Sequence, residues 1–185
     1  MQVNLNLGDT KLIIDECEKR GVSLKHASYI LATAFWETAR TMHPVREAYW
    51  LSESWRRSNL RYYPWYGRGY VQLTWEDNYK RAGAKLGMDL TTDPDVVMRP
   101  NIASEILVVG CVEGWFTGKK LGDYTTYQGM RRVVNGTDKA SEIAEIAIDY
   151  EAALSKTDYG NKTVYSPSGK GFIEMIIELI KRLLK

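Results

Sequence analysis

The feature that most constrains the fold is an apolar stretch with helical periodicity at residues 23–39. Gly21 interrupts the chain before it, and Ser23 can cap its start. Apolar side chains then recur at helical spacing from Leu24 to Phe35. The pattern predicts a helix that packs one face into a hydrophobic core.

Helical signals also dominate the rest of the chain. Asp9 can cap a first helix that ends near Gly21, and Pro100 suits the first turn of a long apolar helix that runs through Val109 to Trp115. A further helix is predicted from about Thr137 to Leu154. The segment Tyr70–Thr74 and the residues before it look strand-like, so we expect a mainly α fold with a small hairpin or sheet beside a cleft.

Glu37 stands out because it lies on the apolar face of the predicted helix, three residues after Ala34. A carboxyl in apolar surroundings tends to be neutral at about pH 7 and can then donate a proton. Cleavage of a glycosidic bond requires such a donor. The alternative is a surface ion pair at the helix end, with Arg40 or Arg46 as the partner.

Length and composition exclude several classes of protein. A chain of 185 residues fits one domain, or one domain with an appendage. The net charge is +2 without a basic run in the body of the chain, so we expect no nucleic-acid partner, and we expect a monomer. Cys17 and Cys111 lie in apolar helical patterns without metal-ligand spacing. They are predicted to be reduced core thiols, and we expect neither a metal nor a cofactor.

A second informative segment runs from Tyr66 to Tyr79. Its Gly-Arg-Gly sequence allows a tight turn, and the alternation that follows would place Gln72 and Thr74 on one polar strand face. Thr74 could also cap the next helix, which would bring Asn78 close to it. A hairpin turn with a helix cap explains this segment as well as a binding site does.

Taken together, these segments resemble the family 19 glycoside hydrolases, a chitinase family whose bacteriophage members are peptidoglycan-cleaving endolysins. The resemblance covers residues 23–154 and includes Val133-Val134-Asn135-Gly136. It implies a lysozyme-like helical domain with a small sheet beside the cleft, with Glu37 as the general acid. It also implies that Thr74 positions the attacking water and that sugar is bound by Tyr66, Arg68, Gln72, Asn78 and Asn135.

The chain departs from the family pattern at three places. Trp36 replaces the usual His before the acid, Tyr70 replaces a frequent Pro, and the position of the second carboxylate in plant chitinases is occupied here by Asn59. Asn cannot act as a base. Members with a shorter spacing point to Glu47 as the base, with Glu53 as the alternative.

The resemblance implies hydrolysis with inversion by a general acid and a general base. We expect an endolysin, a lysozyme-type enzyme that cleaves the β-1,4 glycosidic bonds of bacterial peptidoglycan for host-cell lysis. The alternatives are a chitinase acting on β-1,4 N-acetylglucosamine polymers, a lytic transglycosylase and a non-catalytic cell-wall-binding protein. The N-terminus shows no signal peptide, so we expect synthesis in the host cytoplasm and release to the periplasmic wall with the help of a holin.

The end of the chain shows a change in pattern. We expect a catalytic domain over residues 1–160, followed at 161–185 by a linker and an amphipathic helix. That helix has two interpretations: it docks on the same domain, or residues 170–185 contact the outer membrane or its lipopolysaccharide. We favour docking, because its acidic residues Glu174 and Glu178 weaken attraction to anionic lipid.

Overall fold

The computed structural model describes residues 2–160. The predicted linker and amphipathic helix at 161–185, and with them the predicted membrane contact, lie outside the described residues. Within residues 2–160, no helix is long and apolar enough to cross a membrane.

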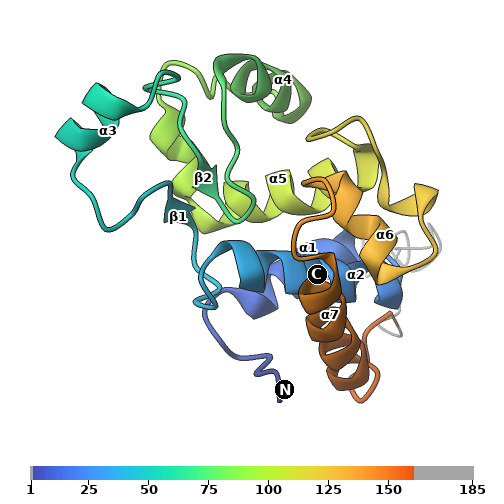
Figure 1. Cartoon of the computed structure of the whole chain (residues 1–185). Helices are drawn as coiled ribbons and strands as arrows, with labels where there is room; N and C mark the ends of the chain where they lie inside the picture. The colour runs from blue at the N-terminus through green and yellow to red at the C-terminus, as the bar shows by residue number, and fades with distance from the viewer. Residues whose placement is uncertain (1, 161–185) are drawn as a thin grey trace, which may run out of the picture.

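The described part of the chain is mainly helical, as the periodicity predicts (Figure 1). Its α-helices are α1 (Thr10–Lys19), α2 (Leu24–Glu37), α3 (Glu53–Asn59), α4 (Glu76–Leu86), α5 (Pro100–Glu113), α6 (Tyr127–Met130) and α7 (Ala140–Leu154). Short 3-10 helices lie at η1 (Pro94–Met98), η2 (Leu121–Asp123) and η3 (Arg131–Val133). Strands β1 (Val45–Arg46) and β2 (Arg68–Gly69) complete the fold.

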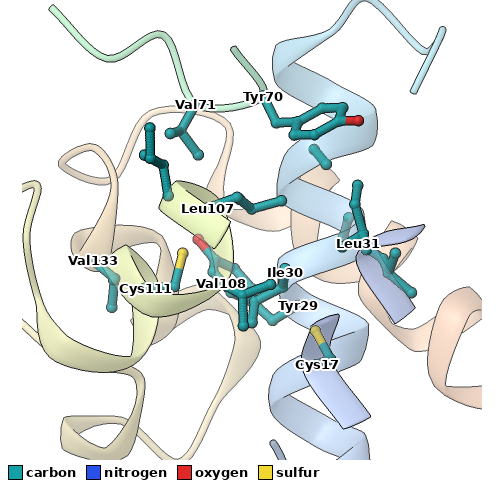
Figure 2. Close-up of a cluster of buried hydrophobic side chains, with 14 of the residues drawn as sticks. Cys17, Tyr29, Ile30, Leu31, Tyr70, Val71, Leu107, Val108, Cys111 and Val133 are labelled. Atoms are coloured by element: carbon teal, nitrogen blue, oxygen red, sulfur yellow. The ribbon is translucent and has the colours of Figure 1, made fainter. Parts of the chain in front are cut away.

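Helix α2 lies in the middle of the core and is buried on every side. Each residue from Ala27 to Phe35 is buried. Helix α7 packs along α2, where the rings of Phe35 and Tyr150 meet edge to face at 6.3 Å, and α1 packs against α5. Figure 2 shows side chains from several of these helices converging on the same core. The end of α2, and therefore Glu37, is held in place by this packing.

The sheet differs from the strand predicted at residues 70–74. Strand β2 ends at Gly69 and pairs antiparallel with β1, so that Val45 lies opposite Gly69 and Arg46 opposite Arg68. Gln72 has a φ of +55°, in the left-handed region, so the chain after β2 reverses instead of extending. This turn buries Val71 and Leu73 and leaves the residues between and after them partly exposed, an alternation that imitates a strand.

Of the three predicted helix caps, Ser23 and Asp9 occupy the N-cap position and Thr74 does not. Ser23 caps α2 as expected, its hydroxyl accepting a hydrogen bond from the amide of His26. The carboxylate of Asp9, at the N-cap of α1, makes no capping bond. The N-cap of α4 is Trp75 rather than Thr74, whose hydroxyl instead donates to the carbonyl of Gln72 at 2.7 Å.

Both cysteines are buried free thiols, as predicted. Burial raises the pKa of the Cys111 thiol to about 12. Burial, together with nearby Cys111, also raises the pKa of Cys17. Both side chains therefore stay protonated and act as small apolar groups in the core.

The central packing predicts a sharp difference between two valines one turn apart on α5. Val108 is fully buried and Val112 is 41% exposed. Val108→Ala should lower the free energy of unfolding by about 1.5–3 kcal/mol, because two buried methyl groups are lost. Val112→Ala should change it by less than about 0.5 kcal/mol. Urea unfolding of both variants measures this, and equal losses would contradict the described burial of the two side chains.

Candidate active site

Glu37 is the last residue of α2, and a buried arginine holds it. The guanidinium of Arg131, 2% exposed, donates from Nη1 to Glu37 Oε1 at 2.7 Å. The Glu37 side chain is 20% exposed, so it keeps some access to solvent. The sequence-based expectation of an isolated acid is therefore wrong, and so are Arg40 and Arg46 as the suggested partners.

Arg131 also connects Glu37 to the segment that carries Asn135. Its Nε donates to the carbonyl of Asp138 at 2.9 Å, and its own carbonyl accepts the amide of Asn135 at 2.9 Å. Asn135 is exposed, and its side-chain oxygen accepts the amide of Gly136. The structure thus places Asn135 on the same short segment as the arginine that holds the predicted acid.

Glu47 follows β1 directly, and both of its carboxylate oxygens accept a hydrogen bond. The hydroxyl of Tyr62 donates to Oε1 at 2.6 Å, and the amide of Gly67 donates to Oε2 at 3.0 Å. The Glu47 amide donates back to the carbonyl of Gly67 at 2.7 Å. Burial and the neighbouring Glu47 raise the pKa of Tyr62 to about 12, so the Tyr62 hydroxyl stays protonated and keeps donating.

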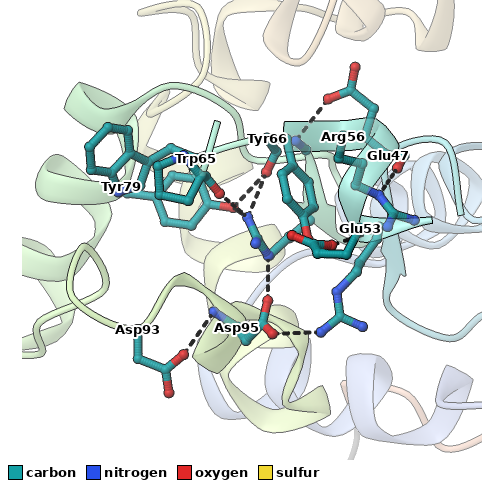
Figure 3. A network of polar contacts seen from close by, with 12 residues as sticks. Glu47, Glu53, Arg56, Trp65, Tyr66, Tyr79, Asp93 and Asp95 are labelled. Carbon is teal, nitrogen blue, oxygen red and sulfur yellow. Dashed lines mark hydrogen bonds and ion pairs between the residues drawn. The ribbon is translucent and has the colours of Figure 1, made fainter. Parts of the chain in front are cut away.

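Glu53, the alternative base, has a different environment (Figure 3). Its Oε2 accepts a hydrogen bond from Tyr66 at 2.9 Å and forms an ion pair with Arg56 at 3.1 Å. Arg56 in turn donates to the backbone carbonyl of Glu47 at 2.8 Å and to that of Ala48 at 3.0 Å. Glu53 therefore helps to orient the arginine that supports the backbone of Glu47.

The side chain of Arg68, from the Gly-Arg-Gly sequence, is buried. Its guanidinium lies 3.6 Å from the ring centroid of Tyr66, and Nε donates to Asp95 Oδ1 at 2.8 Å. Asp95 also accepts a hydrogen bond from Arg46 at 2.7 Å, so one carboxylate joins both strands of the sheet. Tyr66 and Arg68 are 1% and 3% exposed. They support the sheet from within, and direct contact of either with a sugar stays a prediction.

Gln72, Thr74 and Asn78 form a connected group beside the sheet. Gln72 Nε2 donates to the carbonyl of Val45 at 3.0 Å, one residue before Arg46 and two before Glu47. Asn78 Nδ2 donates to the carbonyl of Thr74 at 2.7 Å, which confirms that these two residues are close. The hydroxyl of Thr74 and the amide of Asn78 are therefore both tied to the segment that carries Glu47.

A pocket of about 780 Å³ borders the segments that carry both acids. Thr38, directly after Glu37, and Arg46, directly before Glu47, both line it. Glu53, Arg56 and Asp95 of the polar network also line it, whereas Glu37 and Glu47 themselves do not.

The structure therefore arranges the predicted site residues in two groups. One group gathers around Arg131 with Glu37 and Asn135, and the other around the sheet with Glu47, Gln72, Thr74 and Asn78. Sequence reasoning missed Arg131 and Tyr62, the two side chains that hold the acids. The Arg-Arg pair at 131–132, just before the noted Asn135 motif, was the available signal for Arg131.

The described residues contain no group of three or more His, Cys, Asp or Glu side chains that could hold a metal ion.

The environment of Asp95 leads us to expect that wild type and Asp95→Asn differ in stability by an amount that depends on pH. Burial alone would raise its pKa, but the hydrogen bonds and charges of Arg46 and Arg68 outweigh burial and lower the pKa. A pKa that is lower in the folded than in the unfolded protein stabilises the fold at pH values above the unfolded-state pKa of about 3.9. This contribution is lost as the pH falls through the folded-state pKa. Asp95→Asn should cost about 0.5–1.5 kcal/mol at about pH 7, because Arg68 loses its carboxylate but the 50% exposed Asp95 is screened by solvent.

Urea unfolding of both proteins at a series of pH values measures this difference, which should narrow below about pH 4. Glu76→Gln is the control, because the Glu76–Lys80 ion pair is exposed on both sides and should contribute little. A penalty that stays the same at every pH would rule out the ionised Asp95 carboxylate as the source of the stability.

The fold has a solved counterpart. Chitinase C from Streptomyces griseus HUT6037 superposes with a TM-score of 0.53 and 20% sequence identity, over 71% of this chain and 59% of that one. A mutant of chitinase C superposes with the same TM-score and identity, over 72% of this chain and 71% of that one. At this identity the likeness concerns the fold.

Short segments also match curated plant proteins. An endochitinase of Arabidopsis thaliana is 55% identical over 40 residues, which is 21% of this chain and 14% of that protein. A second Arabidopsis thaliana endochitinase is 41% identical over 58 residues, 31% of this chain and 18% of that protein. An inactive chitinase-like protein of Hevea brasiliensis is 45% identical over 40 residues, 22% of this chain and 13% of that protein. The matched segments thus span less than a fifth of each of these relatives.

The match to a protein family covers more of the chain. Residues 26–120, which include both predicted acids and the Gly-Arg-Gly segment, match the class I chitinases. The match covers more than half of the 185 residues. Together with the chitinase C-like fold, it shows that this chain belongs to family 19 of the glycoside hydrolases, the class I chitinase family.

Proposed function

We propose that this protein hydrolyses β-1,4 bonds between N-acetylhexosamine sugars by a single displacement with inversion. The observation that carries the proposal is that Glu37 and Glu47, two carboxylates with defined partners, each adjoin a residue that lines one pocket. An inverting mechanism needs the two carboxyl groups about 6.5–9.5 Å apart, with room for a water on the far side of the sugar ring. That separation between Glu37 and Glu47 stays a prediction.

Glu37 is the proposed general acid. Its Oε1 accepts the hydrogen bond from Arg131, which leaves Oε2 to carry the proton that is donated to the glycosidic oxygen. Once the proton has left, Glu37 is an anion beside a buried guanidinium, and this charge-assisted hydrogen bond stabilises it. Arg131 thus favours the product of the proton transfer.

Glu47 is the proposed general base. The hydrogen bonds from Tyr62 and Gly67 fix the plane of its carboxylate, so that a remaining lone pair can accept a proton from water. The Thr74 hydroxyl would hold that water on the face of the sugar opposite Glu37. This role is supported by the run of hydrogen bonds that ties residues 72–78 to β1.

Chitin is the substrate class that the comparisons favour. The matched proteins include two endochitinases and chitinase C, and the matching family is that of the class I chitinases. Because these names belong to proteins that this chain matches only in part, chitin as its substrate is a proposal. One matched protein is named an inactive chitinase-like protein. A non-catalytic, glycan-binding role is therefore the first alternative that an experiment should exclude.

Peptidoglycan is the second candidate, because it has the same β-1,4 linked N-acetylhexosamine backbone. The observation in its favour is that both cysteines of the chain are buried free thiols, whereas secreted proteins of this size commonly carry disulfides. An endolysin role, with assisted release to the cell wall, belongs to this candidate.

Product analysis separates the candidates. Purified protein is incubated with chitin oligosaccharides and with purified peptidoglycan, and the products are identified by mass spectrometry and by the anomer first formed. Release from chitin of reducing ends with inverted anomeric configuration supports the main proposal. Release of such ends from peptidoglycan alone supports the second candidate. Anhydro-sugar ends would identify a lytic transglycosylase, and unchanged polymers would identify a binding protein.

Replacing the acid should remove turnover without affecting the fold. Glu37→Gln keeps an oxygen for Arg131 but cannot donate an acidic proton, so kcat should fall by about 10²–10⁴-fold in protein that still folds. Stability should fall by about 1–3 kcal/mol, because the buried Arg131 loses its carboxylate. Glu142→Gln, which alters an exposed carboxylate paired with Lys139, is the matched control and should keep full activity. Near-normal turnover in Glu37→Gln would exclude Glu37 as the general acid.

A second pair of variants tests the base. Glu47→Gln should reduce kcat by about 10²–10⁴-fold, because an amide cannot accept the proton from water. Glu53→Gln should reduce kcat much less, because Glu53 supports the site only through Arg56 and Tyr66. Initial rates on the preferred substrate compare the two, and a greater loss in Glu53→Gln would transfer the role of base to Glu53.

A further inference from the structure

Asp9 occupies the N-cap position of α1 but does not cap the helix. An N-cap aspartate ordinarily accepts a hydrogen bond from a backbone amide in the first turn of its helix. Here the Asp9 carboxylate makes no such bond. Its Oδ2 instead accepts the hydroxyl of Tyr70 at 2.7 Å and lies 3.1 Å from Nδ1 of His43. The carboxylate thus contacts two segments that are far from α1 in the sequence.

One of these segments is the turn directly after Glu37, and its backbone is strained. Ala39, Arg40 and Met42 have φ values of +50°, +67° and +56°, in the left-handed region that disfavours residues other than glycine. Such conformations persist only where surrounding structure holds them.

The N-terminal segment provides that support. The Asp9 amide donates to the carbonyl of Met42 at 2.9 Å. The backbone at Gly8 approaches so closely that an added Cβ would lie 2.5 Å from the carbonyl oxygen of Thr41. Gly8 and Asp9 therefore press against the strained turn, while Thr38 and Thr41 of that turn line the pocket.

The two side-chain partners of Asp9, His43 and Tyr70, lie close in the sequence to predicted site residues. His43 stands between Glu37 and Glu47 in the sequence, and Tyr70 stands two residues before Gln72. Tyr70 is fully buried, and its pKa is raised by burial and then by its hydrogen bond to Asp9, so the hydroxyl stays a donor. One carboxylate therefore joins the loop between the two acids to the turn that carries Gln72 and Thr74.

We propose that Asp9 is a positioning residue, which fixes the Glu37–Glu47 loop relative to the Gln72–Thr74 turn and so sets the geometry of base and water. This inference rests on the proposed hydrolysis. Asp9 lies outside residues 26–120, the part of the chain that matches the family. It is distinct from the catalytic residues because it touches neither of the acids.

The test uses substitutions that remove the contact in small steps. Tyr70→Phe deletes only the hydroxyl, Asp9→Ala removes the acceptor, and Asp9→Asn keeps an acceptor oxygen in place. Tyr159→Phe is the matched control, because it deletes a hydroxyl that donates at 2.7 Å to the carbonyl of Val22, far from both acids in the sequence. Should Asp9→Ala fail to fold, Tyr70→Phe still decides the question.

Kinetics on the preferred substrate form the first measurement. Tyr70→Phe and Asp9→Ala should lower kcat by about 10–100-fold, with KM within about twofold of wild type, because small misplacements of reacting groups affect the chemical step. Asp9→Asn should recover most of the lost kcat. Tyr159→Phe should keep the wild-type kcat, although its melting temperature should fall about as much as that of Tyr70→Phe. Similar kcat values in Tyr70→Phe and Tyr159→Phe would overturn the proposal.

Hydrogen–deuterium exchange forms the second measurement and does not depend on activity. The amides of residues 39–43 should exchange about tenfold faster in Tyr70→Phe and Asp9→Ala than in wild type, with α7 unchanged. Unchanged exchange at residues 39–43 overturns the proposal, and so does faster exchange with undiminished kcat. If the wild-type protein hydrolyses nothing, the proposed function fails, and with it the effect of Asp9 on turnover. The exchange result still decides whether Asp9 holds the loop.

Discussion

The burial of the central part of α2 is the constraint on which the rest of the structure depends. Nine consecutive residues, Ala27–Phe35, are buried, so the helix can neither rotate nor slide without opening the core. Its last residue is Glu37, whose position is therefore set by hydrophobic packing. Arg131 is placed by the same packing, because α6 packs against α7 and α7 against α2, and η3 follows α6 directly.

The segment that carries Glu47 is held by a different kind of interaction. Strands of two residues each cannot be stable by backbone pairing alone. Polar contacts add to the apolar packing here, with Asp95 joining Arg46 to Arg68, and Arg56 bonded to the backbone at residues 47–48. The position of the proposed acid thus follows from core packing, and that of the proposed base from a network of charges and hydrogen bonds.

This difference explains what could be predicted from the sequence. Helical periodicity located α2, α5 and α7 to within a few residues, because each buries a regular apolar pattern. Residues 70–72 are a turn rather than the predicted strand, since a turn with Gln72 at positive φ buries the same alternate residues. The strand lies in the segment before it, at β2, and Leu73 forms a single bridge to Arg68. Arg131 is 94 residues from Glu37, and Tyr62 is 15 residues from Glu47. Contacts of this kind depend on tertiary structure, and no local pattern encodes them.

The partners of the three glutamates bear on the roles proposed for them. A general acid becomes an anion in the reaction, and Glu37 has a buried cation that stabilises this anion. A general base loses its charge when it takes up a proton, so a cationic partner would oppose the step by the energy of the broken ion pair. Glu53 has such a partner in Arg56, whereas the hydrogen bonds to Glu47 come from a neutral hydroxyl and a neutral amide. The neutral partners of Glu47, against the cationic partner of Glu53, are the physical argument for Glu47 as the base.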